Sequence, residues 1–240
     1  MPIAIPHAAY EIRRVFTRDA LSKSMMFILI FAIVLVVFIF ASAELTILAN
    51  PGMGTTALNS ALIPTTTIAT SFIFSVSTVL YLRIVEKKRI SDMVGFLGLS
   101  RDRLSYDTLF TGGMLFAAVF LIEIAVSGIA YFYPNANLST NIGLLLSGQP
   151  LYFLLFTIFI GPVNEEIFFR GLLVQRIGVF WSAVIFAILH TSYMSYTEFA
   201  GALLFGLLAG YVFRKNKSLY STMLPHILIN LIAVMSFLQF

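Results

Sequence analysis

Two adjacent glutamates and an arginine interrupt an apolar run in the C-terminal half of the chain. The run, residues 161–171, reads GPVNEEIFFRG and contains Glu165, Glu166 and Arg170. An ionised side chain at the centre of a membrane costs roughly 2.5–3.5 kcal/mol on insertion scales, so such groups usually face the interior of a bundle and have a function. We therefore take this segment as the first candidate for a reactive site.

Helical spacing predicts different roles for the two glutamates. Glu166 and Arg170 are four residues apart, which places them about 40° from each other around a helix, close enough for an ion pair. Glu165 points about 100° away from Glu166. We expect a structural Glu166–Arg170 pair and a Glu165 carboxylate left for chemistry. The alternative, that both glutamates cap a helix end at the membrane interface, stays open.

Two further apolar segments carry isolated polar residues. His190 ends the run 179–190, and His226 and Asn230 lie four residues apart in the segment 219–240. That spacing places both side chains on the same side of one helix. A lone histidine in an apolar helix is more often a satisfied core residue than a catalyst. Here three separate helices each bring polar groups into the membrane, which predicts one shared site.

Composition shows what kind of scaffold must hold these groups. The 240 residues are 59% hydrophobic and 11% charged, which indicates an all-α, polytopic membrane helical bundle. The absence of cysteine excludes disulfides, thiolate metal sites and a cysteine nucleophile. The net charge of +4 lies in short clusters beside the apolar runs, so no nucleic-acid partner is expected; the expected partner is the lipid bilayer.

Apolar runs predict about seven transmembrane helices, or eight if one is missed. The predicted spans are 25–43, 61–82, 108–132, 151–173, 179–190, 199–213 and 219–240. The fifth and sixth are shorter than the roughly 20 residues of a full crossing, so we expect neighbouring helices to enclose them.

The chain divides into three predicted regions. Residues 1–24 form a cytosolic segment, 25–149 hold N-terminal transmembrane helices with a basic cytosolic loop, and 150–240 form the catalytic core. The loop includes a short interfacial helix near 90–99. An alternative is a cleaved signal over 1–43, since Ala-Ser-Ala at 41–43 resembles a signal-peptidase site.

The distribution of positive charge predicts the orientation. With the N-terminus inside, all 15 Lys and Arg fall at internal positions. The three external segments, 44–60, 133–150 and 191–198, contain none. Cytosolic loops of membrane proteins are enriched in Lys and Arg. We therefore predict a multi-pass protein of the cell membrane with a cytosolic N-terminus and a site towards the internal half of the bilayer.

Two other intramembrane features have simpler interpretations. Glu123 is a lone acid in the third span, and a hydrogen bond to a neighbouring helix is the favoured interpretation. Ala202, Gly206 and Gly210 repeat every four residues, which is typical of close helix packing. Neither is assigned chemistry.

The three polar motifs together resemble the CPBP family of CAAX proteases and bacteriocin-processing enzymes, also called Abi, which includes the type II CAAX prenyl endopeptidases. The family pattern is Glu-Glu-x-x-x-Arg, Phe-x-x-x-His and His-x-x-x-Asn. It stands here, in order and on separate spans, as Glu165-Glu166 to Arg170, Phe186 to His190 and His226 to Asn230. The resemblance covers about residues 150–231. Family members of the CAAX type commonly have eight spans, one more than predicted here.

The resemblance implies an intramembrane endopeptidase that hydrolyses a peptide bond. Glu165 and His190 would activate a water molecule, His226 and Asn230 would stabilise the oxyanion, and Glu166 and Arg170 would support the site. The residue chemistry agrees, because a carboxylate can act as general base and amide or imidazole N–H groups can donate to an oxyanion.

The resemblance also implies the class of substrate. It would be a peptide or membrane protein, and CAAX-type processing of a prenylated C-terminus is one activity within the family. No metal cofactor is favoured, since His-Glu-x-x-His is absent. The alternative is zinc bound by Glu165, His190 and His226.

Two alternatives from other classes stay open. A non-catalytic family member could act as a bacteriocin-immunity protein or membrane scaffold, although the full set of catalytic-type residues argues against this. A proton-coupled transporter would use Glu and His as a relay, but transporters usually show internal repeats, and none is visible.

Overall fold

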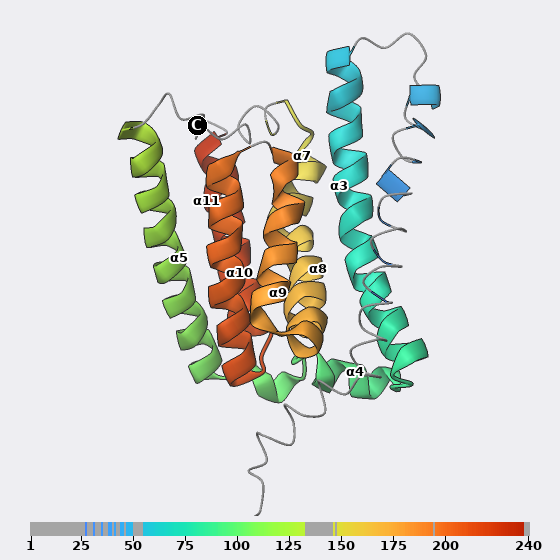
Figure 1. Ribbon diagram of the computed structural model, residues 1–240, viewed down its shortest axis with the longest axis vertical. Helices are drawn as coiled ribbons and strands as arrows, with labels where there is room; N and C mark the ends of the chain where they lie inside the picture. The colour runs from blue at the N-terminus through green and yellow to red at the C-terminus, as the bar shows by residue number, and fades with distance from the viewer. Residues whose placement is uncertain are drawn as a thin grey trace, which may run out of the picture.

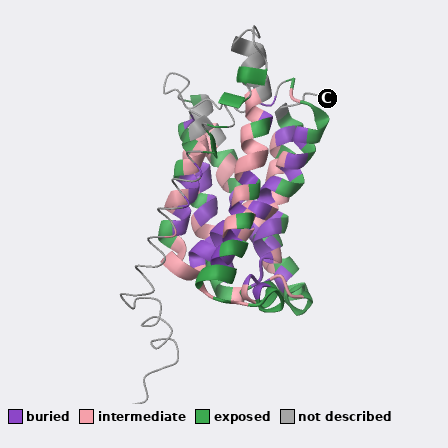
Figure 2. Cartoon of the chain, turned by 90° about the vertical axis from the view of Figure 1, so that its right-hand side faces the viewer, coloured by how far each residue is buried: buried purple, intermediate pink, exposed green. Residues whose placement is uncertain are grey.

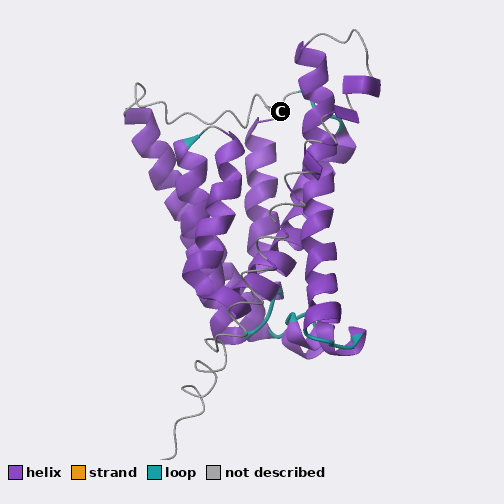
Figure 3. Ribbon diagram, turned by 45° about the vertical axis from the view of Figure 1, so that its right-hand side comes forward, coloured by secondary structure: helices purple, strands orange, loops and turns teal. Residues whose placement is uncertain are grey.

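The computed structural model describes residues 55–132, 146, 148–193 and 195–237, with isolated positions between 27 and 49. Every element in this part of the chain is helical and none is a strand. The helices lie side by side, with their connections gathered at two ends (Figure 3). The predicted all-α membrane bundle is confirmed. The segment 1–24 and most of the predicted span 25–43 lie outside the described residues.

The elements follow one another along the chain as helices of very different length (Figure 1). They are α3 (Thr55–Leu80), η1 (Tyr81–Val85), α4 (Ile90–Phe96), η2 (Arg101–Arg103), α5 (Tyr106–Phe132), α7 (Leu151–Leu155), η4 (Phe156–Ile160), α8 (Gly161–Glu166), η5 (Ile167–Leu173), α9 (Val174–Leu189), η6 (His190–Tyr193), α10 (Tyr196–Asn216) and α11 (Tyr220–Phe237).

Four helical stretches of the described residues are long and apolar enough to cross a membrane. They are Leu62–Val85, Tyr106–Val126, Leu151–Leu189 and Tyr196–Asn216, and Tyr220–Ser236 is a shorter apolar helix. The third stretch contains two predicted spans, because the chain reverses within α9 at Gly178, whose φ of 85° and ψ of 172° suit only glycine. Six of the seven predicted spans therefore have counterparts among the described residues.

Two predicted boundaries are wrong. The predicted external loop 44–60 ends too late, since α3 already begins at Thr55. Polar residues there do not stop the helix because no glycine or proline follows Gly54 until Pro64. The sixth span is also longer than predicted, running over Tyr196–Asn216.

Helices α9 and α10 pack closely through small residues, as the Ala202, Gly206 and Gly210 spacing predicts. A Cβ atom added at Gly206 would lie 2.9 Å from the Cβ of Ala183 and 3.0 Å from its Cα. One added at Gly210 would lie 2.9 Å from Val179 Cγ1. The glycines thus bring the part of α9 near Gly178 close against α10.

We expect Gly206→Ala to destabilise the protein although alanine is the better helix former. The added methyl group meets the backbone of α9, and overpacking of this kind costs about 1–3 kcal/mol. Gly113→Ala in α5 is the matched control, since no atom of the described chain lies within 4 Å of its Cβ position. Thermal unfolding in detergent should show a lower midpoint for the first variant only. Equal midpoints would contradict close α9–α10 packing.

Most positive charge of the described residues gathers at one end of the bundle, which we call the basic end. It comprises residues 83–105, 174–178 and 214–219, and it contains all described Lys and Arg except Arg170. Helix α4 crosses this end (Figure 1). It corresponds to the short interfacial helix that the sequence predicts near residues 90–99. Gln175 Nε2 donates to Phe96 O at 2.9 Å, and Leu219 N donates to Gly98 O at 3.1 Å. These two hydrogen bonds connect the three segments of the basic end.

Leucines of the basic end and of η5 pack next to Arg170, and we call them the apolar floor (Leu97, Leu172 and Leu219, around Gly171). A Cβ atom added at Gly171 would lie 2.8 Å from Leu97 Cδ2 and 3.4 Å from Leu219 Cδ1. All three leucines are buried. They belong to the buried residues that fill the centre of the bundle (Figure 2).

Candidate active site

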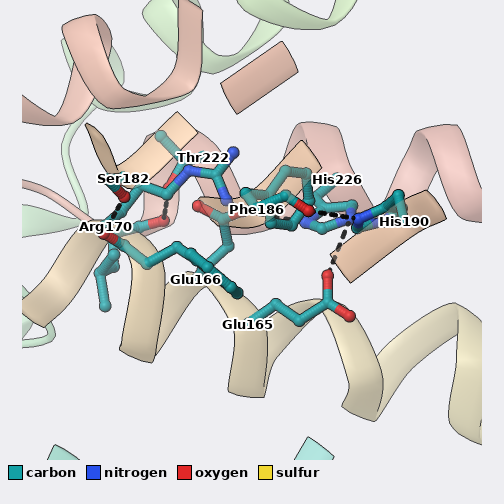
Figure 4. A network of polar contacts seen from close by, with 10 residues as sticks. Glu165, Glu166, Arg170, Ser182, Phe186, His190, Thr222 and His226 are labelled. Atoms are coloured by element: carbon teal, nitrogen blue, oxygen red, sulfur yellow. Dashed lines mark hydrogen bonds and ion pairs between the residues drawn. The ribbon is translucent and has the colours of Figure 1, made fainter. Parts of the chain in front are cut away.

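The predicted site residues come from three helical segments that meet inside the bundle (Figure 4). The stretch 151–173 supplies both glutamates and the arginine, the first residue of η6, directly after α9, is His190, and α11 supplies His226 and Asn230. Five of them form a polar cluster: Glu165, Glu166, Arg170, His190 and His226.

The glutamates lie on a short α-helical block between two π-helical turns. Helix α8 spans six residues, with η4 before it and η5 after it. A π-helical turn takes in one more residue than an α-helical turn and is frequent at functional sites. The two π-helical turns lie on either side of Gly161–Glu166. The orientation of the glutamates therefore depends on the contacts of this block with other helices.

Glu166 and Arg170 form the predicted ion pair. Arg170 Nη1 lies 3.0 Å from Glu166 Oε1, and their side chains are 1% and 0% exposed. The contact is at ion-pair distance without aligned hydrogen bonds from the guanidinium. The guanidinium carbon also lies 4.6 Å from the ring centroid of Phe186 and 4.7 Å from that of Phe205, so two aromatic faces stabilise the charge. Complete burial of Glu166 does not agree with a helix cap at the interface.

His226 lies between the two carboxylates. Its Nδ1 is 2.9 Å from Glu166 Oε1, and its Nε2 is 3.7 Å from Glu165 Oε2. The ring packs 4.6 Å from the ring centroid of Phe205. With the Nδ1 proton donated to Glu166, Nε2 of a neutral imidazole is an acceptor, and it becomes a donor only in the imidazolium form.

Glu165 differs from its neighbour in exposure and in partners. Its side chain is 24% exposed, and no ion pair joins it to an arginine among the described residues. Its carboxylate points towards the imidazoles of His190 and His226 (Figure 4). The structure therefore contains the predicted asymmetry between a buried, charge-paired glutamate and a more accessible one.

His190 is held at the end of α9 by its own helix. Its Nδ1 lies 2.8 Å from Phe186 O, and its ring packs against the Phe186 ring with centroids 4.4 Å apart. The backbone carbonyl can only accept, so the proton sits on Nδ1 and the lone pair of the neutral ring on Nε2. This tautomer suits proton uptake at Nε2.

Asn230 faces the same helical stretch as His226, as predicted, but it lies outside the polar cluster. Its Nδ2 donates to Thr157 O at 2.9 Å. That carbonyl lacks a regular donor, because Gly161 N donates to Phe156 O and Pro162 has no N–H. One amide hydrogen of Asn230 thus satisfies a backbone group that the π-helical turn and the proline leave open.

The polar cluster lies near the middle of the length of α10. His226 packs on Phe205, and Phe205 is the tenth of the 21 residues of α10. The chain reverses at Gly178, beyond the predicted end of the fourth span at Leu173. The predicted position of the site towards the internal half of the bilayer stays a prediction.

Among the described residues, no group of three His, Asp or Glu is arranged to hold a metal ion. His226 Nδ1 and His190 Nδ1 both contact protein oxygens, and a histidine that binds a metal through Nε2 commonly makes such a contact through Nδ1. The expectation of no metal and the alternative of zinc on Glu165, His190 and His226 both stay predictions.

Sequence reasoning missed a second polar contact beside the glutamates. Asn164 Nδ2 donates to Ser71 Oγ at 3.0 Å, and Ser75 Oγ donates to Asn164 Oδ1 at 2.6 Å. Two serines four residues apart in an apolar helix were the available signal. Glu123, by contrast, faces α10, since its Oε1 would lie 2.6 Å from a Cβ at Gly201. It is not part of the polar cluster.

Comparison with known proteins agrees with the motifs. Residues 147–232 match the family model described as type II CAAX prenyl endopeptidase Rce1-like. No curated protein and no solved structure matches the chain. All six predicted site residues fall inside the matched segment. The predicted resemblance is confirmed over residues 147–232, which are similar to the type II CAAX prenyl endopeptidases that this family model describes.

Proposed function

We propose that the protein is an intramembrane endopeptidase in which Glu165 is the general base. The observation that carries this proposal is the asymmetry of the glutamate pair. Glu166 is fully buried against Arg170, whereas Glu165 is 24% exposed and faces two imidazoles. The family match supports a protease of the CAAX type.

Water activation is assigned to Glu165 and His190. A water molecule between the Glu165 carboxylate and His190 Nε2 loses a proton to Glu165 as its oxygen attacks the scissile carbonyl. The carbonyl π bond opens and its oxygen becomes the oxyanion. When the intermediate collapses, the C–N bond breaks and the proton passes from Glu165 to the leaving amine. General acid–base catalysis of this kind contributes typically about 10²–10⁴-fold.

Oxyanion stabilisation is assigned to His226 and Asn230. His226 donates from Nε2 in its imidazolium form, while its Nδ1 stays 2.9 Å from Glu166 Oε1. Asn230 supplies its second amide hydrogen, since the first is bound to Thr157 O. Glu166 and Arg170 hold His226 in place and do not contact the substrate.

The proposed substrate is a peptide or membrane protein that enters the bilayer. The family name suggests a prenylated C-terminal peptide as its class. The proposed location is the cell membrane, with the N-terminus and the basic end on the cytosolic side, because Lys and Arg are enriched in cytosolic loops. The proposed reaction involves no nucleic acid and no metal.

Cleavage of defined peptides in liposomes tests this proposal. A library of C-terminal and single-span peptides, with and without a prenyl group, is incubated with the protein in the presence and absence of a chelator. We expect cleavage that the chelator does not change. Loss in chelator with recovery in zinc would overturn the metal-free mechanism. Absence of cleavage in folded protein would favour a scaffold or immunity role.

We expect Asn230→Asp to lower kcat by about 10²–10³-fold with little change in KM, the usual effect of losing one oxyanion donor. The aspartate keeps the shape of the side chain but has no N–H to donate. Asn216→Asp is the matched control, because Asn216 Oδ1 is an acceptor for Ser218 N and Ser221 Oγ. Steady-state kinetics and a melting curve distinguish catalysis from stability. An unchanged kcat would remove Asn230 from the mechanism and fit a proton relay better.

A further inference from the structure

The polar contact between α3 and α8 lies directly beside the proposed base. Asn164 precedes Glu165, and its side chain bonds to Ser71 Oγ at 3.0 Å and to Ser75 Oγ at 2.6 Å. Asn164 and Ser71 are buried. We call these three residues the amide clamp. Both ends of the Asn164 amide have a partner, so the clamp specifies one orientation of that side chain in an apolar environment.

The position of the clamp determines how α8 is rotated about its axis. Successive residues of an α-helix are about 100° apart, so Asn164 and Glu166 point to nearly opposite sides. Asn164 contacts α3, and Glu166 contacts His226 of α11. Helix α8 is therefore held from two sides, and Glu165 projects between them towards the histidines (Figure 4).

This support matters because α8 cannot be held by helix continuity alone. It has six residues and lies between the π-helical turns η4 and η5. A π-helical turn shifts the angular phase of the residues that follow it. A small rotation of α8 would move the Glu165 carboxylate relative to both imidazoles, and misplacement by about 1 Å can cost about 10²-fold in rate.

We propose that Asn164, Ser71 and Ser75 are positioning residues for Glu165, an inference that rests on the proposed function. Ser71 and Ser75 lie in α3, outside the segment 147–232 that matches the family model. The N-terminal half of the chain is thus part of the working site and not only a membrane anchor.

Two readouts on the full chain test this inference. Ser71→Ala/Ser75→Ala should lower kcat by about 10²-fold with KM unchanged, and Ser71→Thr/Ser75→Thr, which keeps both hydroxyls, should restore it. Ser77→Ala is the matched control in the same helix, because Ser77 Oγ donates to a carbonyl of α3 itself, Phe74 O, at 3.0 Å.

The second readout needs no enzymatic activity. The chain has no cysteine, so Glu165→Cys introduces a single thiol whose alkylation rate reports the position and exposure of residue 165. We expect the double alanine variant to change this rate several-fold and Ser77→Ala to leave it unchanged. If the double variant does not fold, the single variants Ser71→Ala and Ser75→Ala allow the same comparison.

The outcomes separate the two proposals. Unchanged alkylation and unchanged kcat would overturn the amide clamp and leave the protease intact. A changed alkylation rate in a protein that cleaves no peptide would support the clamp and remove the proposed function. Loss of kcat that the threonine variant does not restore would overturn the assignment to the hydroxyl groups.

Discussion

We expect Glu165→Gln to lower the rate of peptide cleavage by about 10³-fold or more, within the range for loss of a general base and the water it activates. Glutamine keeps the size of the side chain and can still accept a hydrogen bond, but it cannot take a proton from water. Because Glu165 is 24% exposed and pairs with no arginine of the described chain, the change should leave the folded state intact. Single-turnover cleavage in liposomes measures the effect, beside melting curves.

Glu123→Gln is the matched control for this result. Glu123 is an intramembrane carboxylate of α5 that faces Gly201 of α10, outside the polar cluster. The same chemical change there should leave cleavage within a small factor of the wild type. If both variants lost activity equally, a general loss of intramembrane charge would explain the data better than base catalysis by Glu165.

We expect Arg170→Met to prevent accumulation of folded protein. It removes the partner of a carboxylate that is 0% exposed, and breaking a buried ion pair in this way costs about 3–5 kcal/mol, because one charge is left uncompensated. The contacts of the guanidinium with Phe186 and Phe205 are lost as well. Yield after detergent extraction and the melting temperature report the effect.

The double variant Glu166→Gln/Arg170→Met distinguishes charge from packing. The amide oxygen of the introduced glutamine can still accept from His226 Nδ1, so removing both charges should recover part of the stability that Arg170→Met alone loses. Arg214→Met, an exposed arginine in the last turn of α10, should behave as wild type. No recovery in the double variant would assign the loss to the aromatic contacts instead.

Local spacing predicted the parts of the site that depend on a single helix. The Glu166–Arg170 pair follows from a four-residue separation, and the same rule places His226 and Asn230 on one side of α11. The family motifs then indicated which helices meet. These features could be predicted because neither helix spacing nor motif order depends on how the helices pack.

Features that depend on helix packing or on an irregular backbone could not be predicted from residue spacing and hydropathy. The amide clamp joins Ser71 to Asn164 only because α3 and α8 face each other in one rotation. The bond from Asn230 to Thr157 depends on a π-helical turn followed by Pro162. The reversal of the chain at Gly178 lies inside one continuous helical stretch, and hydropathy does not locate it. The predicted span at residues 25–43 lies largely outside the described residues.

The apolar floor has a consequence for the membrane itself. Carboxylates and imidazoles at mid-depth are the groups through which protons cross bilayers in pumps and transporters. Conduction requires that such groups connect to water on both sides, and a dry hydrophobic constriction interrupts the connection. Leu97, Leu172 and Leu219 are 6%, 1% and 0% exposed, and Leu97 and Leu219 pack around Gly171, next to Arg170. Such a layer of buried apolar side chains on one side of the polar cluster is of the kind that interrupts a water connection through a membrane protein.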